Sequence, residues 1–297
     1  MRLRPSHLLL ICLVAITWTH AAPRTQPAPR EIEANGAKLT YVDQGTGEPI
    51  IFLHGSLSDR RVWEPIRETI AARYRFIAPT LRYFGTGAWP DKGEQFGTAH
   101  HAADIVAFIR AVNVGPVHLV GWSYGANVAL AVALDRPDLL RSVILFEPAL
   151  SSLIQEDAAA KDAQRRIFGP VVSAMRAGDA EKATKLLVEG LLELPPGGFE
   201  SLPEAVRRMQ LDNARTMPLL FSAPPLFVTC DGLKTSNTPV LIVYGGDSNA
   251  YWRHIAEVMD ACLPRGEAVA LTGAKHDGPA RDPAGSAAMI ESFVAKH

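Results

Sequence analysis

The chain has 297 residues, of which 47% are hydrophobic and 21% are charged, a composition typical of a folded globular protein rather than a disordered one. Its 30 basic and 31 acidic residues give a formal net charge of −1. Because basic residues neither dominate nor form a run, the charge argues against nucleic acid as a partner. The length suits one large domain, or one domain that carries an insertion.

The N-terminal segment differs from the rest of the chain. Arg2 and Arg4 precede an uncharged apolar run over residues 8–18, which is the layout of a secretory signal peptide. We therefore expect residues 1–21 to be cleaved, residues 22–29 to form a flexible lead-in, and the protein to be secreted or periplasmic. The run is shorter than the roughly 20 residues of a membrane span, so no stable membrane insertion is expected after cleavage. An uncleaved anchor is the alternative.

The first structural signal is Asn35-Gly36, which separates two short alternating runs and predicts a β-hairpin. After it, short apolar runs alternate with longer helical patterns, which is typical of a parallel sheet covered by helices on both faces. The expected strands include residues 50–53, 76–78, 117–120, 143–146, 240–243 and 268–271, and the expected helices include 61–73, 99–112, 125–135, 251–263 and 284–295. We predict a doubly wound, mostly parallel α/β sheet with the hairpin at its antiparallel edge.

Residues 149–237 interrupt this alternation, because they contain no convincing strand. Helical patterns lie near residues 155–176, 179–192 and 202–215. We interpret this segment as a helical lid inserted into a core formed by residues 30–148 and 238–297. A separate helical domain with no role in the site is the alternative.

Two cysteines, Cys230 and Cys262, remain after the expected signal peptide is removed. An exported protein can pair them, but nothing in the sequence brings their Cα atoms together. A disulfide and two free thiols therefore both stay open, and so does the oligomeric state.

The strongest chemical signal is Gly121-Trp122-Ser123-Tyr124-Gly125, between the strand that ends at Val120 and the helix over 125–135. A nucleophilic serine needs this sharp strand-to-helix turn, which lifts its hydroxyl clear of the sheet. The flanking glycines let the strained backbone pass its neighbours. The start of the helix also favours developing negative charge.

From about residue 30 to residue 295, the chain resembles the α/β-hydrolase superfamily. It is most similar to the lidded members: esterases, carbon–carbon bond hydrolases, cofactor-free haloperoxidases, haloalkane dehalogenases and epoxide hydrolases. The last two use an aspartate nucleophile, so Ser123 favours the serine branch. The resemblance implies a serine hydrolase that acts on a small, fairly apolar ester through an acyl-enzyme. A haloperoxidase or perhydrolase, a carbon–carbon bond hydrolase and a non-catalytic binding protein are the alternatives.

The resemblance also implies roles for single residues. The backbone N–H groups of Ser56, after His54-Gly55, and of Tyr124 would form an oxyanion hole. His276, just after the last expected strand, would be the general base, because a serine hydroxyl needs a proton acceptor that titrates near neutral pH. His54 itself is expected to be structural.

The acid of the triad has two candidates. The family commonly places an aspartate fourth in Gly-x-x-Asp after the strand at 240–243, but Gly245-Gly-Asp-Ser has Asp247 third and Ser248 fourth. Some lidded relatives keep the acid one strand earlier, where this chain has Glu147. Either carboxylate can orient the histidine, and we favour Glu147.

Pocket residues are expected around this site. Thr80 replaces the usual aspartate of a loop that borders the pocket in the family. The candidates for substrate binding are Tyr83 and Phe84 from that loop, together with Leu57, Trp122 and Phe168. The histidines do not pair with Cys, Asp or Glu at metal-ligand spacing, and no phosphate-binding glycine loop is present. We expect no metal and no cofactor, and a small molecule as substrate.

Overall fold

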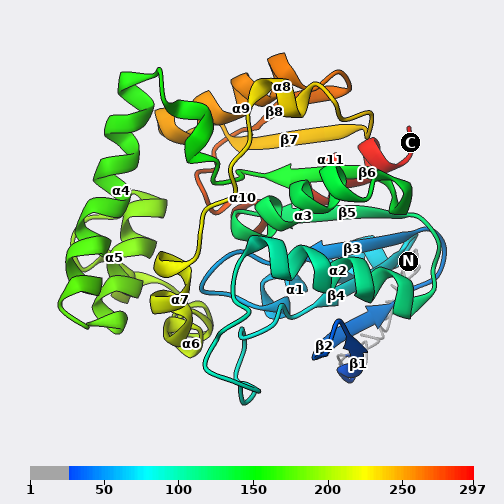
Figure 1. Ribbon diagram of the computed structural model, residues 1–297, viewed down its shortest axis with the longest axis horizontal. Helices are drawn as coiled ribbons and strands as arrows, with labels where there is room; N and C mark the ends of the chain where they lie inside the picture. The colour runs from blue at the N-terminus through cyan, green and yellow to red at the C-terminus, as the bar shows by residue number, and fades with distance from the viewer. Residues whose placement is uncertain (1–26) are drawn as a thin grey trace, which may run out of the picture.

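The computed structural model describes residues 27–297 (Figure 1). The expected signal peptide over 1–21, and most of the lead-in over 22–29, lie outside the described residues. Within the described part, no helix is both long enough and apolar enough to span a membrane.

The described residues form one eight-stranded sheet with the order β1-β2-β4-β3-β5-β6-β7-β8. In the part of the sheet from β4 through β3, β5, β6 and β7 to β8, every strand is parallel to its neighbours. The strand β2 is antiparallel to both β1 and β4. The strands are β1 (Arg30–Ala34), β2 (Ala37–Gln44), β3 (Pro49–Leu53), β4 (Arg75–Pro79), β5 (Val117–Trp122), β6 (Leu140–Phe146), β7 (Val240–Gly245) and β8 (Gly266–Leu271). The predicted fold class, a mostly parallel α/β sheet with an antiparallel edge, is confirmed.

The edge hairpin has the turn that its sequence predicts. Asn35 and Gly36 both have positive φ, at 51° and 70°, and Ala34 pairs with Ala37 across the two-residue turn. Positive φ at both central positions matches the right-handed twist of the strands, and asparagine and glycine adopt it at low cost.

Helices cover both faces of the sheet because the central strands are buried on both. In β3, Ile51 and Leu53 belong to one hydrophobic cluster, and Ile50 and Phe52 belong to the other, as expected when successive side chains alternate between faces. The first cluster includes buried residues of α2 (Thr98–Val112), α3 (Tyr124–Asp135) and α9 (Ala250–Cys262). The second includes residues of α1 (Glu64–Ala71) and α11 (Pro283–Val294).

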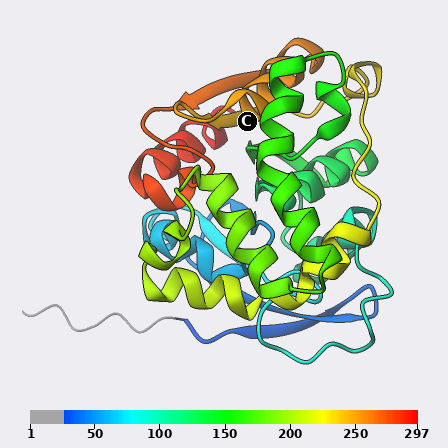
Figure 2. The ribbon, with the colours of Figure 1, turned by 90° about the vertical axis from the view of Figure 1, so that its left-hand side faces the viewer.

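The chain between β6 and β7 folds into helices and contains no strand. These are α4 (Ala158–Arg176), α5 (Ala180–Leu192), α6 (Glu204–Asp212), α7 (Met217–Ser222) and α8 (Cys230–Leu233). Helices α4, α5, α6 and α7 lie beside the carboxyl ends of the parallel strands (Figure 1), and α4 and α5 run side by side across this end of the molecule (Figure 2). We call the segment over 149–237 the helical insertion; its role as a lid stays a prediction.

The two cysteines that the sequence left open are paired. Cys230 begins α8, the last helix of the insertion, and Cys262 ends α9 of the core. Their Cα atoms lie 5.2 Å apart and their sulfurs are bonded. The disulfide therefore fastens the end of the insertion to a helix that covers the sheet.

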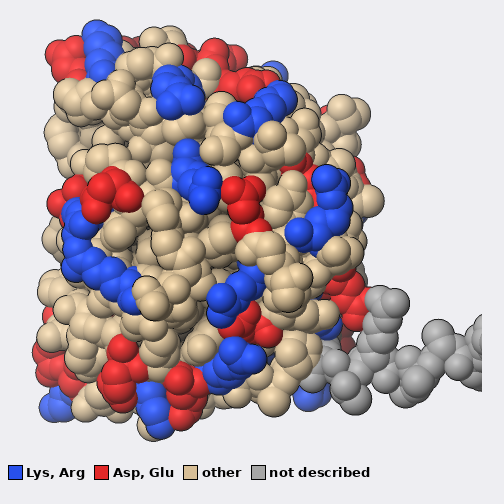
Figure 3. All heavy atoms as spheres, turned by 90° about the vertical axis from the view of Figure 1, so that its right-hand side faces the viewer, with Lys and Arg blue, Asp and Glu red and all other residues tan. Residues whose placement is uncertain are grey.

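The surface on the far side of the molecule from the insertion carries interspersed charges. Basic and acidic side chains alternate there with uncharged ones (Figure 3). The picture agrees with the nearly balanced count of basic and acidic residues in the sequence.

Candidate active site

Ser123 occupies the sharp turn between β5 and α3. Its backbone has φ 55° and ψ −115°, a region that residues with a side chain seldom adopt and that costs free energy. Its N–H donates to the Phe146 carbonyl at 2.8 Å, and its own carbonyl accepts from the N–H of Ala126 at 2.9 Å. Neighbouring backbone therefore holds the turn on both sides.

Gly121 and Gly125, on either side of this serine, are required because backbone carbonyl groups approach their Cα atoms closely. A Cβ atom on Gly121 would lie 2.4 Å from the carbonyl oxygen of Gly125, and one on Gly125 would lie 2.4 Å from that of His54. Both distances are far below van der Waals contact. The turn can thus form only if both positions lack a side chain.

His276 lies in the loop after β8, and both the imidazole and its partner are buried. Its Nδ1 is 2.6 Å from Oε2 of Glu147, and each side chain is 4% exposed. Glu147 follows β6 directly, with φ 45°. The imidazole also stacks on the ring of Trp252, with centroids 4.0 Å apart and planes at 19°. The ring of His276 is thereby fixed in direction and in plane.

The second oxygen of Glu147 is also held. Its Oε1 accepts hydrogen bonds from the N–H of Gly245 at 2.8 Å and from the hydroxyl of Ser248 at 2.5 Å. Ser248 stands at the position where the family commonly has its aspartate. Ser248 therefore supports Glu147, the carboxylate that takes the place of the usual aspartate of the family.

Of the two candidate acids, the structure brings Glu147 and not Asp247 to His276. Asp247 is exposed, and its backbone N–H donates to the Ala274 carbonyl at 2.9 Å. The alternative expectation that Asp247 is the acid is therefore wrong, because the backbone of this residue holds the turn after β7 and its side chain is exposed.

Ser123 borders two cavities. The larger has a volume of about 330 Å³ and is lined by Ser56, Tyr124 and residues of the helical insertion as well as by Ser123. The smaller has a volume of about 120 Å³ and is lined by both Ser123 and His276. Tyr124 is the first residue of α3, so its N–H has no acceptor within the helix and is available at the positive end of the helix dipole.

The larger cavity has no Asp, Glu, Lys or Arg in its wall. Its polar side chains include Gln164, Ser151 and Tyr251. The amide of Gln164 donates to the Ser151 hydroxyl at 2.6 Å, which lies 3.4 Å from the hydroxyl of Tyr251. Most of the remaining wall is apolar and comes from α4, α5, α7 and the segment over 223–226.

Three of the five expected pocket residues line these cavities. Leu57 and Trp122 belong to the smaller one, and Phe168 belongs to the larger. Tyr83 and Phe84 belong to neither, which corrects that expectation.

The reason is that both aromatic side chains are buried in the loop and its neighbours. The Tyr83 hydroxyl donates to Asp91 Oδ2 at 3.0 Å and accepts from the N–H of Gln95 at 3.2 Å. The Phe84 ring packs against His54 and Tyr124.

Sequence reasoning missed several site residues. Trp252 lies against the histidine and lines the larger cavity, and the segment over 220–226 contributes several lining residues. The pair Tyr251-Trp252, at the start of the helix after β7, was the available signal for the first. The short helix α7 gave no comparable periodicity for the second.

His54 is structural, as the sequence predicts. Its Nδ1 lies 2.8 Å from the Gly55 carbonyl, and its Nε2 accepts from the N–H of Leu81 at 3.0 Å. Burial lowers the pKa of His54 to about 4. The ring is therefore neutral, and its two nitrogens hold the loop of Leu81 against the turn after β3.

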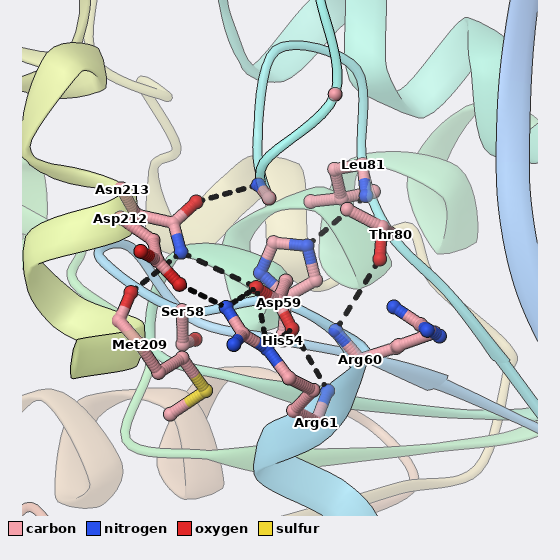
Figure 4. A network of polar contacts seen from close by, with 12 residues as sticks. His54, Ser58, Asp59, Arg60, Arg61, Thr80, Leu81, Met209, Asp212 and Asn213 are labelled. Carbon is pink, nitrogen blue, oxygen red and sulfur yellow. Dashed lines mark hydrogen bonds and ion pairs between the residues drawn. The ribbon is translucent and has the colours of Figure 1, made fainter. Parts of the chain in front are cut away.

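A polar network beside His54 joins this turn to the helical insertion (Figure 4). Arg61 donates to Asp59 and, at 2.8 Å, to Asp212 at the end of α6. Asn213 accepts from the N–H of Gly85 at 2.6 Å and donates to the Met209 carbonyl at 2.8 Å. Burial acts to raise the pKa of Asp59, but hydrogen bonds from Arg61 outweigh it and lower the pKa. The network fixes α6, which carries part of the wall of the smaller cavity.

Among residues 27–297, no group of three or more His, Cys, Asp or Glu side chains is arranged to hold a metal ion.

A serine at a strand-to-helix turn, a late histidine and a strand-end carboxylate, on a mostly parallel sheet of this order, define an α/β-hydrolase fold. The chain belongs to the Alpha/beta hydrolase family, whose pattern matches residues 50–289. Members of this family are hydrolases, and the resemblance found in the sequence is confirmed.

Known proteins similar to this chain carry several activities. A pyrrolizixenacetamide deacetylase of Xenorhabdus hominickii is 31% identical over 41% of this chain and 46% of its own. A haloalkane dehalogenase of Mycobacterium bovis is 28% identical over 89% of this chain and 94% of its own. Several curated relatives are matched over less than half of their length. The crystal structure of an esterase from Rhodococcus sp. has a TM-score of 0.74 at 23% identity, covering 90% of this chain and 98% of that one, which shows the shared fold.

Proposed function

We propose that the protein is a serine hydrolase that acts on a small, fairly apolar carboxylic ester or related acyl compound through an acyl-enzyme. The observation that carries the proposal is that His276, held by the buried carboxylate of Glu147, lines one cavity together with Ser123 at its strained turn. An adjacent base that is itself oriented by a third group activates a serine hydroxyl as a nucleophile.

In the proposed first step, Nε2 of His276 takes the proton of Ser123 while Oγ attacks the carbonyl carbon. Glu147 accepts the hydrogen bond from Nδ1–H, which keeps Nε2 free to accept the proton and stabilises the imidazolium that forms. The backbone N–H groups of Ser56 and Tyr124 stabilise the oxyanion, an effect typically worth about 3 to 4 kcal/mol per donor. Water, deprotonated by His276, then releases the acid.

The wall of the larger cavity supports an uncharged substrate. No charged side chain lines the larger cavity, and an ion placed in such a wall would lose its hydration without a partner. The presence of serine rather than aspartate at position 123 supports acyl transfer, and the deacetylase among the relatives is named for a reaction of this class.

We also propose that the protein is exported. The disulfide between Cys230 and Cys262 supports this, because such bonds persist in oxidising compartments and are rare in the cytosol. Mass spectrometry of the protein from its native host should find an N-terminus near Ala22. An intact Met1 in the soluble fraction would contradict the proposal.

A fluorophosphonate probe tests the nucleophile. The wild-type protein should be labelled at Ser123 and should hydrolyse simple esters, and Ser123→Ala should lose both properties while keeping its fold. A protein that is neither labelled nor active on a broad ester panel would be a binding protein on this fold. Peroxide-dependent halogenation that exceeds ester hydrolysis would favour a cofactor-free haloperoxidase instead.

A further inference from the structure

The two cavities at the candidate active site meet at the same three residues. Ser56, Ser123 and Leu191 line both of them. An ester whose carbonyl carbon lies at Oγ of Ser123 can therefore extend one arm into each cavity. The question is which arm, acyl or alcohol, each cavity receives.

The position of His276 decides between the two orientations. It lines the smaller cavity and is not part of the wall of the larger one. In acylation, the bond from Oγ to the carbonyl carbon forms, the bond from that carbon to the alcohol oxygen breaks, and the proton taken from Oγ passes from Nε2 to the departing oxygen. That oxygen must lie within hydrogen-bonding reach of Nε2, and hence on the side of the smaller cavity.

We infer that the larger cavity binds the acyl group and the smaller one binds the alcohol. The substrates are then esters of a short alcohol with a bulky acyl group that carries no charge. The inference rests on the proposed function and adds the substrate class. The smaller cavity, at about 120 Å³, is somewhat smaller than a cavity of about 150 Å³ that holds one benzene molecule, which limits the alcohol to about six heavy atoms. The larger cavity, at about 330 Å³, accommodates a longer chain.

The chemistry of the two walls agrees with this assignment. Phe168, Leu187 and Leu220 give the larger cavity an apolar surface from three helices of the insertion, as an aliphatic or aromatic acyl group requires. The smaller cavity includes Asp277 in its wall. A leaving group with a negative charge is thus disfavoured there, whereas a neutral alcohol is not.

Two isomeric esters provide the test. Ethyl octanoate and octyl acetate have the same formula and differ only in which side of the carbonyl carries the long chain. We expect kcat/KM of the wild-type protein, followed by pH-stat titration, to be at least tenfold higher for ethyl octanoate. Equal values, or a higher value for octyl acetate, would overturn the inference.

Two matched variants test each cavity separately. Ala223 lines the larger cavity and Val206 the smaller, and both are only half-buried, so a phenylalanine at either position can be accommodated. Ala223→Phe should reduce the preference for ethyl octanoate over ethyl butanoate at least tenfold. Val206→Phe should instead reduce the preference for butyl over methyl octanoate by a similar factor. Interchanged effects of the two variants would overturn the assignment.

Failure of the inference differs from failure of the proposed function. If neither isomer is hydrolysed and the fluorophosphonate does not label Ser123, the proposed function fails and the inference with it. If Ser123 is labelled and octyl acetate is the better substrate, only the orientation is wrong.

Discussion

Glu147→Gln provides a sharp test of the site, because the structure dictates how the new amide must lie. The N–H of Gly245 and the hydroxyl of Ser248 both donate to Oε1, so the carbonyl oxygen of the glutamine is held there. Its NH₂ group then faces Nδ1 of His276, at the place where Oε2 was 2.6 Å away. Nδ1 must accept that hydrogen bond, the ring proton moves to Nε2, and Nε2 can no longer take the proton of Ser123.

The expected loss is about 10,000-fold in kcat, the size seen when a triad carboxylate becomes an amide, or about 5.4 kcal/mol in activation free energy. The assay is the initial rate at saturating ethyl octanoate, with circular dichroism to show that the fold is kept. Asp247→Asn is the matched control and should stay within about twofold of the wild type. If Glu147→Gln keeps kcat within tenfold, or if Asp247→Asn loses as much, the reasoning about the acid is wrong.

Three further predictions concern stability. The disulfide closes a loop with a sequence separation of 32 residues, which corresponds to about 3 to 4 kcal/mol of stability; urea midpoints that are equal with and without reductant would contradict this. Burial lowers the pKa of His54 to about 4 and that of His101, a buried residue of α2 whose Nδ1 lies 2.7 Å from the Tyr124 hydroxyl, to about 3; both values are below the unfolded value near 6.5. Protons then bind the unfolded chain first, so these two histidines alone should decrease the free energy of unfolding by up to about 2.7 kcal/mol per pH unit as pH falls from 6 to 4, and a urea midpoint that is flat over this range would count against it. Asn213→Ala leaves the N–H of Gly85 without its acceptor and should lower the free energy of unfolding by about 1 to 3 kcal/mol, measured by urea denaturation; a loss below 0.5 kcal/mol would show that the contact is dispensable.

Much of the fold was predictable because it follows from local patterns. Continuous apolar runs gave the central strands, and Asn35-Gly36 gave the hairpin. The glycines around Ser123 marked the turn, since no other residue fits the close approaches measured there. These signals depend on neighbours in sequence, so a single chain carries them.

The rest depended on contacts between distant segments. The choice between Glu147 and Asp247 turns on backbone direction at two strand ends, where φ at Glu147 is 45°, and residue identity does not reveal that. The short helices α7 and α8 and the pairing of Cys230 with Cys262 likewise arise from packing across the fold. Tyr83 and Phe84 lie in the expected loop, but their side chains turn into the protein interior.

The position of Glu147 has a practical consequence for engineering. It lies at the junction with the helical insertion, and the side chain of Asn127 clamps the next part of that junction by bonding both the N–H and the carbonyl of Ala149, at 2.9 and 3.1 Å. A chimaera that receives a foreign insertion should therefore be spliced after Ala149 and not at the end of β6. A splice at the end of β6 would remove Glu147, the partner of His276, together with the native insertion that is being replaced.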